Sequence, residues 1–281
     1  MNSVAIIQAR MSSSRLPGKV MLNIGDRPML EWVVDRTRRA QCLDEVVVAT
    51  TTDPSDDPIF EFCHDKGYRV GRGSVHDVLD RYYQIAKQLQ TDVVVRITAD
   101  CPLIDPELID QTMVVFMSGM GSQEMGAHHF DFAANRLPPP WGRTYPIGLD
   151  IEIFTFDALK RAHRLAISKY QREHVAPYFY EGTPVDQLQY QVPGSPYSAA
   201  LSPHGFKIAL KHHTPDYGQL RWTVDTPEDL ELLRKIVTYF PDDTFSWLDV
   251  LRLVQKHPEL TRINDQVRHK THLDIDSRTA G

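Results

Sequence analysis

The sequence predicts an α/β protein built around a mainly parallel β-sheet with helices on its faces. Four short apolar runs rich in β-branched residues are typical of strands that are buried on both faces. These runs are Val4–Gln8, Glu45–Thr50, Val93–Thr98 and Leu220–Val224. Each leads through a polar turn to a helix-start signal. Strands and helices that alternate at this spacing predict βαβ units, whose ligands lie at the carboxyl ends of the strands.

Proline and capping residues mark where the helices should begin. Helix starts are expected at Pro28, Pro58, Asp77, Asp105-Pro106 and Thr226-Pro227. Proline suits the first helical turn, and Asp or Thr before it can cap the free backbone N–H groups. Gly67 should end the helix that Pro58 opens. Asp229 follows Thr226 by three residues, which predicts a capping-box-like start for the last of these helices.

Two segments depart from the alternation of strands and helices. Residues 119–146 are rich in Gly, Pro and Met and predict a long loop, a candidate lid or subunit contact. Residues 182–219 predict a small irregular arm with one short strand at Phe206–Leu210. We therefore expect a single domain over residues 1–257 and a C-terminal tail over 258–281, poorly ordered from about Asn264.

Composition restricts the classes of function. The 281 residues are 42% hydrophobic and 24% charged, as in ordinary globular proteins. The net charge of −6, from 37 acidic and 31 basic side chains, argues against general nucleic-acid binding. The apolar run Val4–Ile7 is too short for a membrane span or a signal peptide. Three cysteines without CxxC spacing favour the reducing cytoplasm over a zinc site or a disulfide framework.

The loop after the first strand concentrates positive charge. Arg10, Arg15 and Lys19 lie in a stretch of small residues, where side chains and backbone N–H groups could surround a polyphosphate. A Walker A loop is absent, because Ser13 stands where that motif needs Gly and Val20 where it needs Ser or Thr. From these residues alone, a phosphate site and a solvated turn are equally good interpretations.

Two aspartates follow predicted strands. Asp100 stands at the end of Val93–Thr98, and Asp225 directly follows Leu220–Val224. If the strand ends meet, the carboxylates form a hard oxygen site suited to Mg²⁺. The alternative is that Asp225 caps a helix and Asp100 forms a turn.

Six ordered segments together are specific to one family. They are Gln8–Lys19, Val48–Thr52, Arg72–Ser74, Asp77–Tyr82, Arg96–Asp105 and Thr223–Asp229. Over about residues 3–238 the chain resembles the cytidylyltransferase-like proteins of bacterial spore-coat polysaccharide biosynthesis. More distantly, it is similar to acylneuraminate and 3-deoxy-manno-octulosonate cytidylyltransferases.

The resemblance implies a Rossmann-like, glycosyltransferase-A-type nucleotidyltransferase fold, in which a sugar or sugar-acid hydroxyl attacks the α-phosphate of CTP and releases pyrophosphate. It implies nucleotide binding by Gln8, Ala9, Arg10, Arg15, Lys19, Arg72 and Ser74. Asp100 and Asp225 match the family's metal-binding aspartates, for Mg²⁺ or Mn²⁺. Arg10, Lys19 and Asp100 would be catalytic, with Asp100 helping to deprotonate the hydroxyl. The family also implies a homodimer.

The acceptor side is predicted from two further stretches. Asp150, Glu152, Arg172 and His174 are candidates for a sugar pocket, although Asp150 and Glu152 could instead form a solvated strand face. An acceptor carboxylate would need an arginine such as Arg172 or Arg143.

Two other functions compete with cytidylyl transfer. A glycosyltransferase that uses a nucleotide sugar would need a DxD pair, and Asp100-Cys101-Pro102 lacks the second aspartate. A non-catalytic nucleotide-binding partner in the same pathway is disfavoured by the presence of Arg10, Arg15, Lys19, Asp100 and Asp225.

Overall fold

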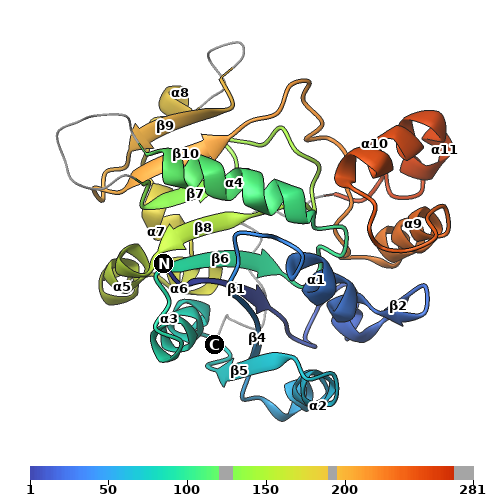
Figure 1. Ribbon diagram of the computed structural model, residues 1–281, viewed down its shortest axis with the longest axis horizontal. Helices are drawn as coiled ribbons and strands as arrows, with labels where there is room; N and C mark the ends of the chain where they lie inside the picture. Colours follow the sequence, from blue (N-terminus) through green and yellow to red (C-terminus); the bar gives the residue numbers. More distant parts are fainter. Residues whose placement is uncertain (120–128, 189–194, 269–281) are drawn as a thin grey trace.

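A computed structural model describes residues 1–119, 129–188 and 195–268, and these form an eight-stranded mixed sheet between two helical layers (Figure 1). The strands, in order across the sheet, are β5 (Arg69–Gly73), β4 (Glu45–Thr51), β1 (Ser3–Gln8), β6 (Val93–Thr98), β8 (Glu152–Thr155), β7 (Phe132–Ala134), β10 (Lys207–Lys211) and β9 (Tyr197–Leu201). Neighbouring strands from β5 to β6 are parallel, and so are β7 and β10. Strand β8 is antiparallel to β6 and β7, and β9 to β10.

Alternation along the central strand divides the core between the two faces of the sheet. Ala5 and Ile7 of β1 pack into one hydrophobic cluster, and Val4 and Ile6 into the other. This is the pattern of a strand covered on both sides, because successive side chains point to opposite faces. The predicted α/β class is confirmed.

The helices divide between the two clusters. On the face of Ala5 and Ile7 lie α1 (Met29–Thr37), α2 (Asp57–Asp65), α4 (Pro106–Ser118), α9 (Pro227–Val237), α10 (Trp247–Lys256) and α11 (Pro258–Thr261). On the other face lie α3 (Val78–Gln88), α5 (Phe156–Leu165), α7 (Pro177–Tyr180) and α8 (Val185–Leu188), and α6 (Lys169–His174) contacts α3. Short elements η1 (Lys19–Met21), β2 (Asn23–Ile24), β3 (Arg27–Pro28) and η2 (Pro54–Asp56) complete the described structure.

The predicted helix starts are confirmed to within one residue. Asp77 caps α3 by accepting from Asp80 N at 2.8 Å, and Asp105 caps α4 by accepting from Leu108 N at 2.9 Å. Thr226 and Asp229 form the expected capping box of α9. These caps satisfy backbone N–H groups that have no partner inside their helices.

The predicted strand Leu220–Val224 is wrong. The segment is extended and largely buried, but it makes only an isolated bridge between Arg221 and Ile147. Its backbone N–H groups bond to two different segments. Trp222 N donates to the Ile147 carbonyl at 2.7 Å, and Val224 N donates to the Asp100 carbonyl at 2.9 Å. Because the segment is buried, its sequence is apolar like that of a strand, although it forms no continuous β-ladder.

Strands also occur inside both segments that the sequence predicts to be irregular. Within 119–146, residues 132–134 form β7, and within 182–219 a β9–β10 hairpin builds the sheet edge. The expected strand Phe206–Leu210 is confirmed as β10, displaced by one residue. β7 was missed because a three-residue strand has no readable period, and β9 because its sequence is rich in small residues. Residues 120–128 and 189–194 lie outside the described part.

The C-terminal tail was predicted to begin too early. Leu260 of α11 is buried in the core, and Asn264 is only 5% exposed. The predicted loss of order at Asn264 is therefore wrong at that position. No described helix combines the length and apolar character needed to cross a membrane.

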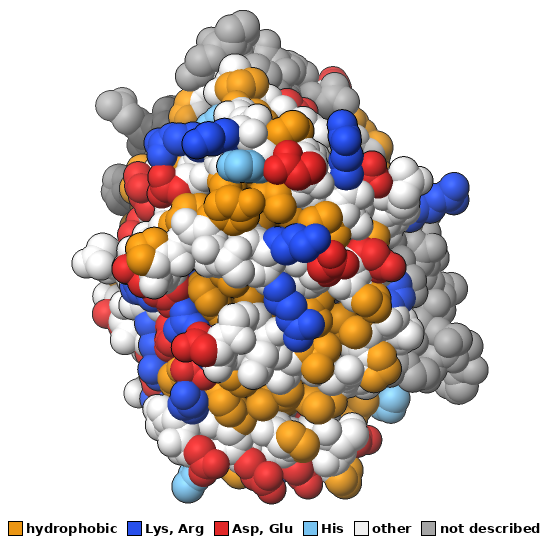
Figure 2. All heavy atoms as spheres, turned by 90° about the vertical axis from the view of Figure 1, so that its right-hand side faces the viewer, with side chains coloured by type: hydrophobic (Ala, Val, Ile, Leu, Met, Phe, Trp, Pro, Cys, Tyr) orange, Lys and Arg blue, Asp and Glu red, His pale blue; other side chains and the backbone are white. Residues whose placement is uncertain are grey.

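Strands β1 and β6 end on the side of the molecule that carries α9, α10 and α11 (Figure 1). Seen from that side, acidic and basic side chains are interspersed among apolar ones (Figure 2). Charge on this visible face is therefore mixed, without a patch of a single sign.

Candidate functional site

Lys19 joins the two predicted aspartates. Its Nζ donates to Asp100 Oδ2, to Asp225 Oδ1 and to the Val224 carbonyl, each at 2.8 Å. Lys19 begins η1, Asp100 follows β6, and Asp225 precedes α9. Three segments distant in sequence thus meet at one buried ammonium group, on the predicted side of the sheet.

Backbone contacts bring Asp225 to Asp100. Val224 N and Thr223 Oγ1 both donate to the Asp100 carbonyl, at 2.9 and 3.0 Å. On the other side, Gly148 packs so closely that a Cβ there would lie 2.5 Å from Thr223 N. Gly148 also has a φ of +103°, so both space and conformation require glycine.

Asp225 lies among three cationic side chains. Besides its contact with Lys19, Asp225 pairs through its Oδ2 atom with Arg15 Nη2 at 2.9 Å. The same oxygen accepts a hydrogen bond from Arg221 Nη2 at 2.8 Å. Arg221 is in turn held by Asp229, which accepts from its Nε and Nη2 at 2.9 Å each. This network fixes the orientation of the Asp225 carboxylate.

The network shifts ionisation in the expected directions. Burial opposes charge on Asp225, but Lys19, Arg15 and Arg221 together hold its pKa well below the usual range. Burial likewise opposes charge on Lys19, yet Asp100 and Asp225 raise the pKa of its ammonium group. Both groups are therefore charged at neutral pH, as an ion-pair network requires.

The basic loop between β1 and η1 is held at its ends. Gly18 N donates to the Met11 carbonyl at 2.8 Å, and Met11 N to Asp56 Oδ1 at 2.6 Å. Among the described residues, the backbone N–H groups of Ser12, Ser13 and Ser14 find no acceptor. Backbone donors presented in a turn beside Arg15 and Lys19 are suited to phosphate oxygens. The phosphate interpretation requires such donors, and the loop presents them beside two cationic side chains.

The other residues predicted to bind the nucleotide lie around the ends of β1 and β5. Gln8 is the last residue of β1, and Ala9 and Arg10 follow it. Burial lowers the pKa of Arg81, and the charge of nearby Arg10 also contributes to this lowering. Ser74 Oγ accepts from the backbone N–H groups of His76 and Asp77.

Arg72 is engaged by the chain itself. Its Nε donates to the Thr51 carbonyl at 2.7 Å, and its Nη2 to Asp57 Oδ1 at 2.7 Å. These contacts tie β5 to the end of β4 and to the start of α2, so in this structure Arg72 orders the rim of the site.

On the acceptor side, Asp150 and Glu152 are each paired with arginine. Asp150 Oδ1 accepts from Arg143 Nη1 at 2.6 Å, and Arg136 Nε lies 3.4 Å from Asp150 Oδ2. Glu152 is 5% exposed and accepts from Arg96 Nη1 at 2.7 Å. Glu152 is therefore not on a solvated strand face, and Asp150 precedes β8 and is partly exposed.

None of the contacts of Arg172 joins it to the Asp150 and Glu152 pairs. Its Nε donates to Asp77 at 2.6 Å, and its Nη1 to the carbonyls of His163 and Ala166. It joins α6 to α3 and to the end of α5. His174 packs its ring against Tyr170, with centroids 5.2 Å apart.

Comparison with known proteins agrees with this site and fold. A family model described as cytidylyltransferase matches residues 4–239, which include the basic loop and both aspartates. The chain belongs to the cytidylyltransferase family. Members of this family are CTP-dependent nucleotidyltransferases, so the basic loop and the two aspartates are interpreted in that chemistry.

Relatives of this cytidylyltransferase match over most of its length. The spore coat polysaccharide biosynthesis protein SpsF of Bacillus subtilis is 30% identical over 90% of this chain and 94% of its own. A 3-deoxy-manno-octulosonate cytidylyltransferase of Anaeromyxobacter dehalogenans is 30% identical over 83% of this chain and 96% of its own. A solved cytidylyltransferase from Leptospira borgpetersenii is 32% identical, with a TM-score of 0.78, covering 96% of this chain and 100% of the other.

The donor set of this cytidylyltransferase fits a divalent cation. Asp100 Oδ2 and Asp225 Oδ1 both lie 2.8 Å from the Lys19 Nζ atom, so the two carboxylates converge on one cationic position. Within the described ranges no group of three or more His, Cys, Asp or Glu side chains forms a metal cage. Two carboxylates completed by phosphate oxygens and water are a typical arrangement for Mg²⁺.

Several residues of the network were not singled out from the sequence. Arg221 and Arg136 lie outside the family-like segments, and Arg96 stands in one without a role assigned to it; only their partners reveal them. Asp229 was identified as a capping residue, but its buried pairing with Arg221 was not. Arg221 and Asp229 are eight residues apart, across a turn and a helix start, so no fixed spacing announces them.

Proposed function

We propose that this cytidylyltransferase transfers CMP from CTP to a hydroxyl group of a sugar or sugar acid, for a surface polysaccharide or glycoconjugate, with Mg²⁺ or Mn²⁺. The observation that carries the proposal is the convergence of Asp100 and Asp225 on Lys19 beside a basic loop. The names of two relatives, one in spore-coat polysaccharide synthesis and one an octulosonate cytidylyltransferase, support this acceptor class.

In the proposed reaction, the acceptor oxygen bonds to the α-phosphorus of CTP, the bond to the β-phosphate oxygen breaks, and pyrophosphate leaves. Arg10, Arg15, Lys19 and the Ser12–Ser14 backbone N–H groups would hold the phosphates. Their positive charge stabilises the departing pyrophosphate, which is the main requirement of phosphoryl transfer. The hydroxyl proton passes to a carboxylate oxygen of Asp100.

Asp100 and Asp225 would hold the divalent cation. When bound, this cation neutralises phosphate charge and lowers the pKa of an oxygen beside it. Arg15 and Lys19 now contact the same carboxylates, so we expect nucleotide binding to redistribute these contacts.

Arg136 is the residue we propose for an acceptor carboxylate. Among the described residues its two terminal nitrogens donate no hydrogen bond, whereas both terminal nitrogens of Arg143 are directed at Asp150. Its side chain is 26% exposed, so a ligand can reach it. A guanidinium group with unused donors matches a carboxylate in a fork.

The first test is thermal unfolding of the protein with Mg²⁺ and, in turn, CTP, UTP, ATP, GTP, dTTP and several nucleotide sugars. A ligand at about 100 times its Kd adds roughly 2.7 kcal/mol to the free energy of unfolding. We expect a metal-dependent shift with CTP that exceeds the others. A shift with nucleotide sugars alone would favour the glycosyltransferase, and no shift with any ligand would favour the non-catalytic partner.

Replacing Lys19 with Met tests the carboxylate pair without any nucleotide. With EDTA, Lys19→Met should lose about 2–3 kcal/mol of stability, because Asp100 and Asp225 would face each other without their shared cation. Mg²⁺ should restore part of this loss, and more than it adds to the wild type. Thermal unfolding with EDTA and with Mg²⁺ measures both, with exposed Lys160→Met as control. Equal stability and equal Mg²⁺ response in both proteins would contradict the proposed site.

Replacing Arg136 with Gln tests the acceptor class. Arg136→Gln should raise the KM of a carboxylated acceptor at least tenfold, as loss of a hydrogen-bonded charge pair predicts, and leave the KM of CTP unchanged. Pyrophosphate release measures both constants, with exposed Arg252→Gln as control. An unchanged acceptor KM would place the carboxylate elsewhere.

We also propose that the protein acts as a homodimer in the cytoplasm. The three cysteines are free thiols, which supports a reducing compartment. The family resemblance and the exposed apolar side chains Val114 and Met117 of α4 support self-association. Sedimentation at several protein concentrations would show the oligomeric state, and a monomer throughout would contradict the dimer.

A further inference from the structure

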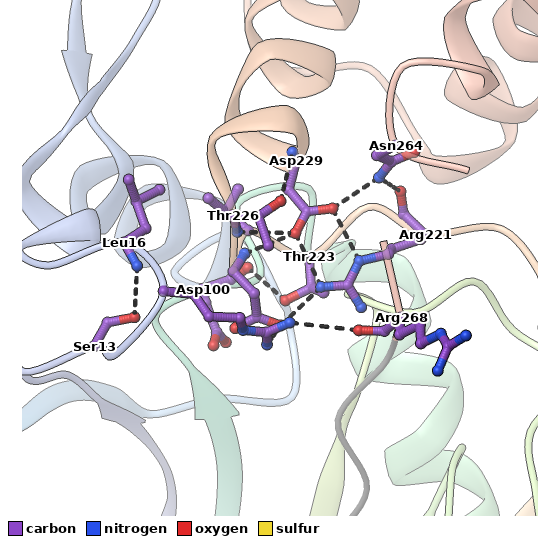
Figure 3. A network of polar contacts seen from close by, with 12 residues as sticks. Ser13, Leu16, Asp100, Arg221, Thr223, Thr226, Asp229, Asn264 and Arg268 are labelled. Atoms are coloured by element: carbon purple, nitrogen blue, oxygen red, sulfur yellow. Dashed lines mark hydrogen bonds and ion pairs between the residues drawn. The ribbon is translucent and has the colours of Figure 1, made fainter. Parts of the chain in front are cut away.

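The C-terminal segment after α10 reaches the site. The family match ends at residue 239, so residues 257–268 lie outside it. Leu260 anchors the segment in the core, and Asn264 follows it into a buried position. Figure 3 shows Asn264 and Arg268 beside Arg221 and Asp229.

Asn264 contacts the group that holds Arg221. Its Nδ2 donates to Asp229 Oδ1 at 2.8 Å and to the Arg221 carbonyl at 3.1 Å. The Asp229 side chain is fully buried and also accepts from the backbone N–H groups of Asp225 and Thr226, at 3.0 and 3.1 Å. Asn264 therefore completes a carboxylate that has no solvent to satisfy it.

Asp229 is linked to Asp225 through Arg221. Arg221 Nη2 donates both to Asp229 Oδ2 at 2.9 Å and to Asp225 Oδ2 at 2.8 Å. Because Asp229 fixes the guanidinium plane through two nitrogens, it also fixes the direction from which Asp225 is held. A chain of contacts thus runs from Asn264 through Asp229 and Arg221 to the proposed metal ligand.

The same segment meets the phosphate loop at a second point. Arg15 Nη1 lies 3.4 Å from the Arg268 carbonyl, while Arg15 Nη2 pairs with Asp225 at 2.9 Å. Arg268 is exposed, so only its backbone serves this contact. Two independent contacts from one segment therefore converge on Asp225 and Arg15.

We propose that the C-terminal segment sets the affinity of the nucleotide site, with Asn264 as a positioning residue that orients Asp225 through Asp229 and Arg221. This inference rests on the proposed function in that the ligand of Asp225 is the metal–CTP complex. It goes beyond that function by assigning the site a part that the family match does not include. Without Asn264, Asp229 loses one of its hydrogen-bond donors. Arg221, which Asp229 holds, then positions Asp225 less firmly.

The test compares Asn264→Ala and Asn264→Asp with Asp265→Ala, an exposed neighbour, and with Val254→Ala, a core truncation in α10. Hydrogen exchange of peptides that cover residues 221–229 reports the network without any nucleotide. Calorimetric titration with Mn²⁺ and CTP reports the site. Asn264→Ala should accelerate exchange at Asp225 and Thr226 and weaken Mn²⁺·CTP binding about tenfold, the weight of one hydrogen bond to a charged group. Asn264→Asp, which turns an oxygen toward Asp229, should weaken binding further.

Each outcome decides the proposal. Faster exchange with weaker binding in the Asn264 variants, and neither in the two controls, supports it. Unchanged exchange overturns it, and so does unchanged affinity in a wild type that binds CTP. An equal loss of Mn²⁺·CTP affinity in Val254→Ala would mean that Asn264 acts only through stability, and it would also overturn the proposal. If wild type binds no CTP, the proposed function fails, and the exchange data still decide whether Asn264 orders Asp225.

Discussion

Asp100→Asn is expected to lower turnover on the order of 1,000-fold while leaving the fold intact. The amide oxygen can still accept from Lys19, so the contact that joins the segments survives. The variant nevertheless loses the charge that would hold the cation and the base that would take the hydroxyl proton, and each is worth a large factor in rate. Pyrophosphate release with saturating CTP and acceptor measures the effect.

The control for this prediction is Asp186→Asn, an exposed aspartate in α8. Thermal unfolding should show a cooperative transition for both variants. Asp100→Asn should unfold only slightly earlier than wild type, because Lys19 keeps Asp225 as a charged partner. Turnover of Asp100→Asn near the wild-type value, with metal still bound, would remove Asp100 from the chemistry.

Arg221→Met is expected to have the largest effect on stability, a loss of about 3–5 kcal/mol. The Arg221 side chain is 6% exposed, and its removal takes two charged hydrogen bonds from fully buried Asp229. Breaking one side of a buried pair is costly because the other charge stays without compensation. Urea unfolding measures the loss, with Arg252→Met as a control, since Arg252 is 71% exposed.

The pH dependence gives this prediction a signature. In the wild type burial opposes the charge of Asp229, but hydrogen bonds from Arg221 and Asn264 lower its pKa. A lowered pKa contributes stability above the ordinary value of about 3.9, and this stability is lost as pH falls through the folded value. Without Arg221, burial should raise the pKa instead. The cost of the substitution should therefore be larger near pH 7 than near pH 4, and a constant cost would contradict the mechanism.

Sequence alone determined the fold class, the helix starts and the cationic loop, because these depend on local patterns. Buried strands have β-branched runs, and Asp77, Asp105 and Thr226 carry capping chemistry that acts within three residues. The places of Asp100 and Asp225 after predicted strands suggested a pair, and the resemblance matched them to metal-binding residues.

Tertiary structure alone decided which charges meet. Lys19 contacts residues 81 and 206 positions away, and nothing local encodes such distances. It also turned Leu220–Val224 from an expected strand into a buried connection. The same packing placed Arg172 in contact with Asp77. It also placed Asn264, which the sequence assigned to the tail, in contact with Asp229. Local rules fix backbone conformation over a few residues, whereas ion pairs depend on how distant segments pack, and that packing is a property of the whole chain.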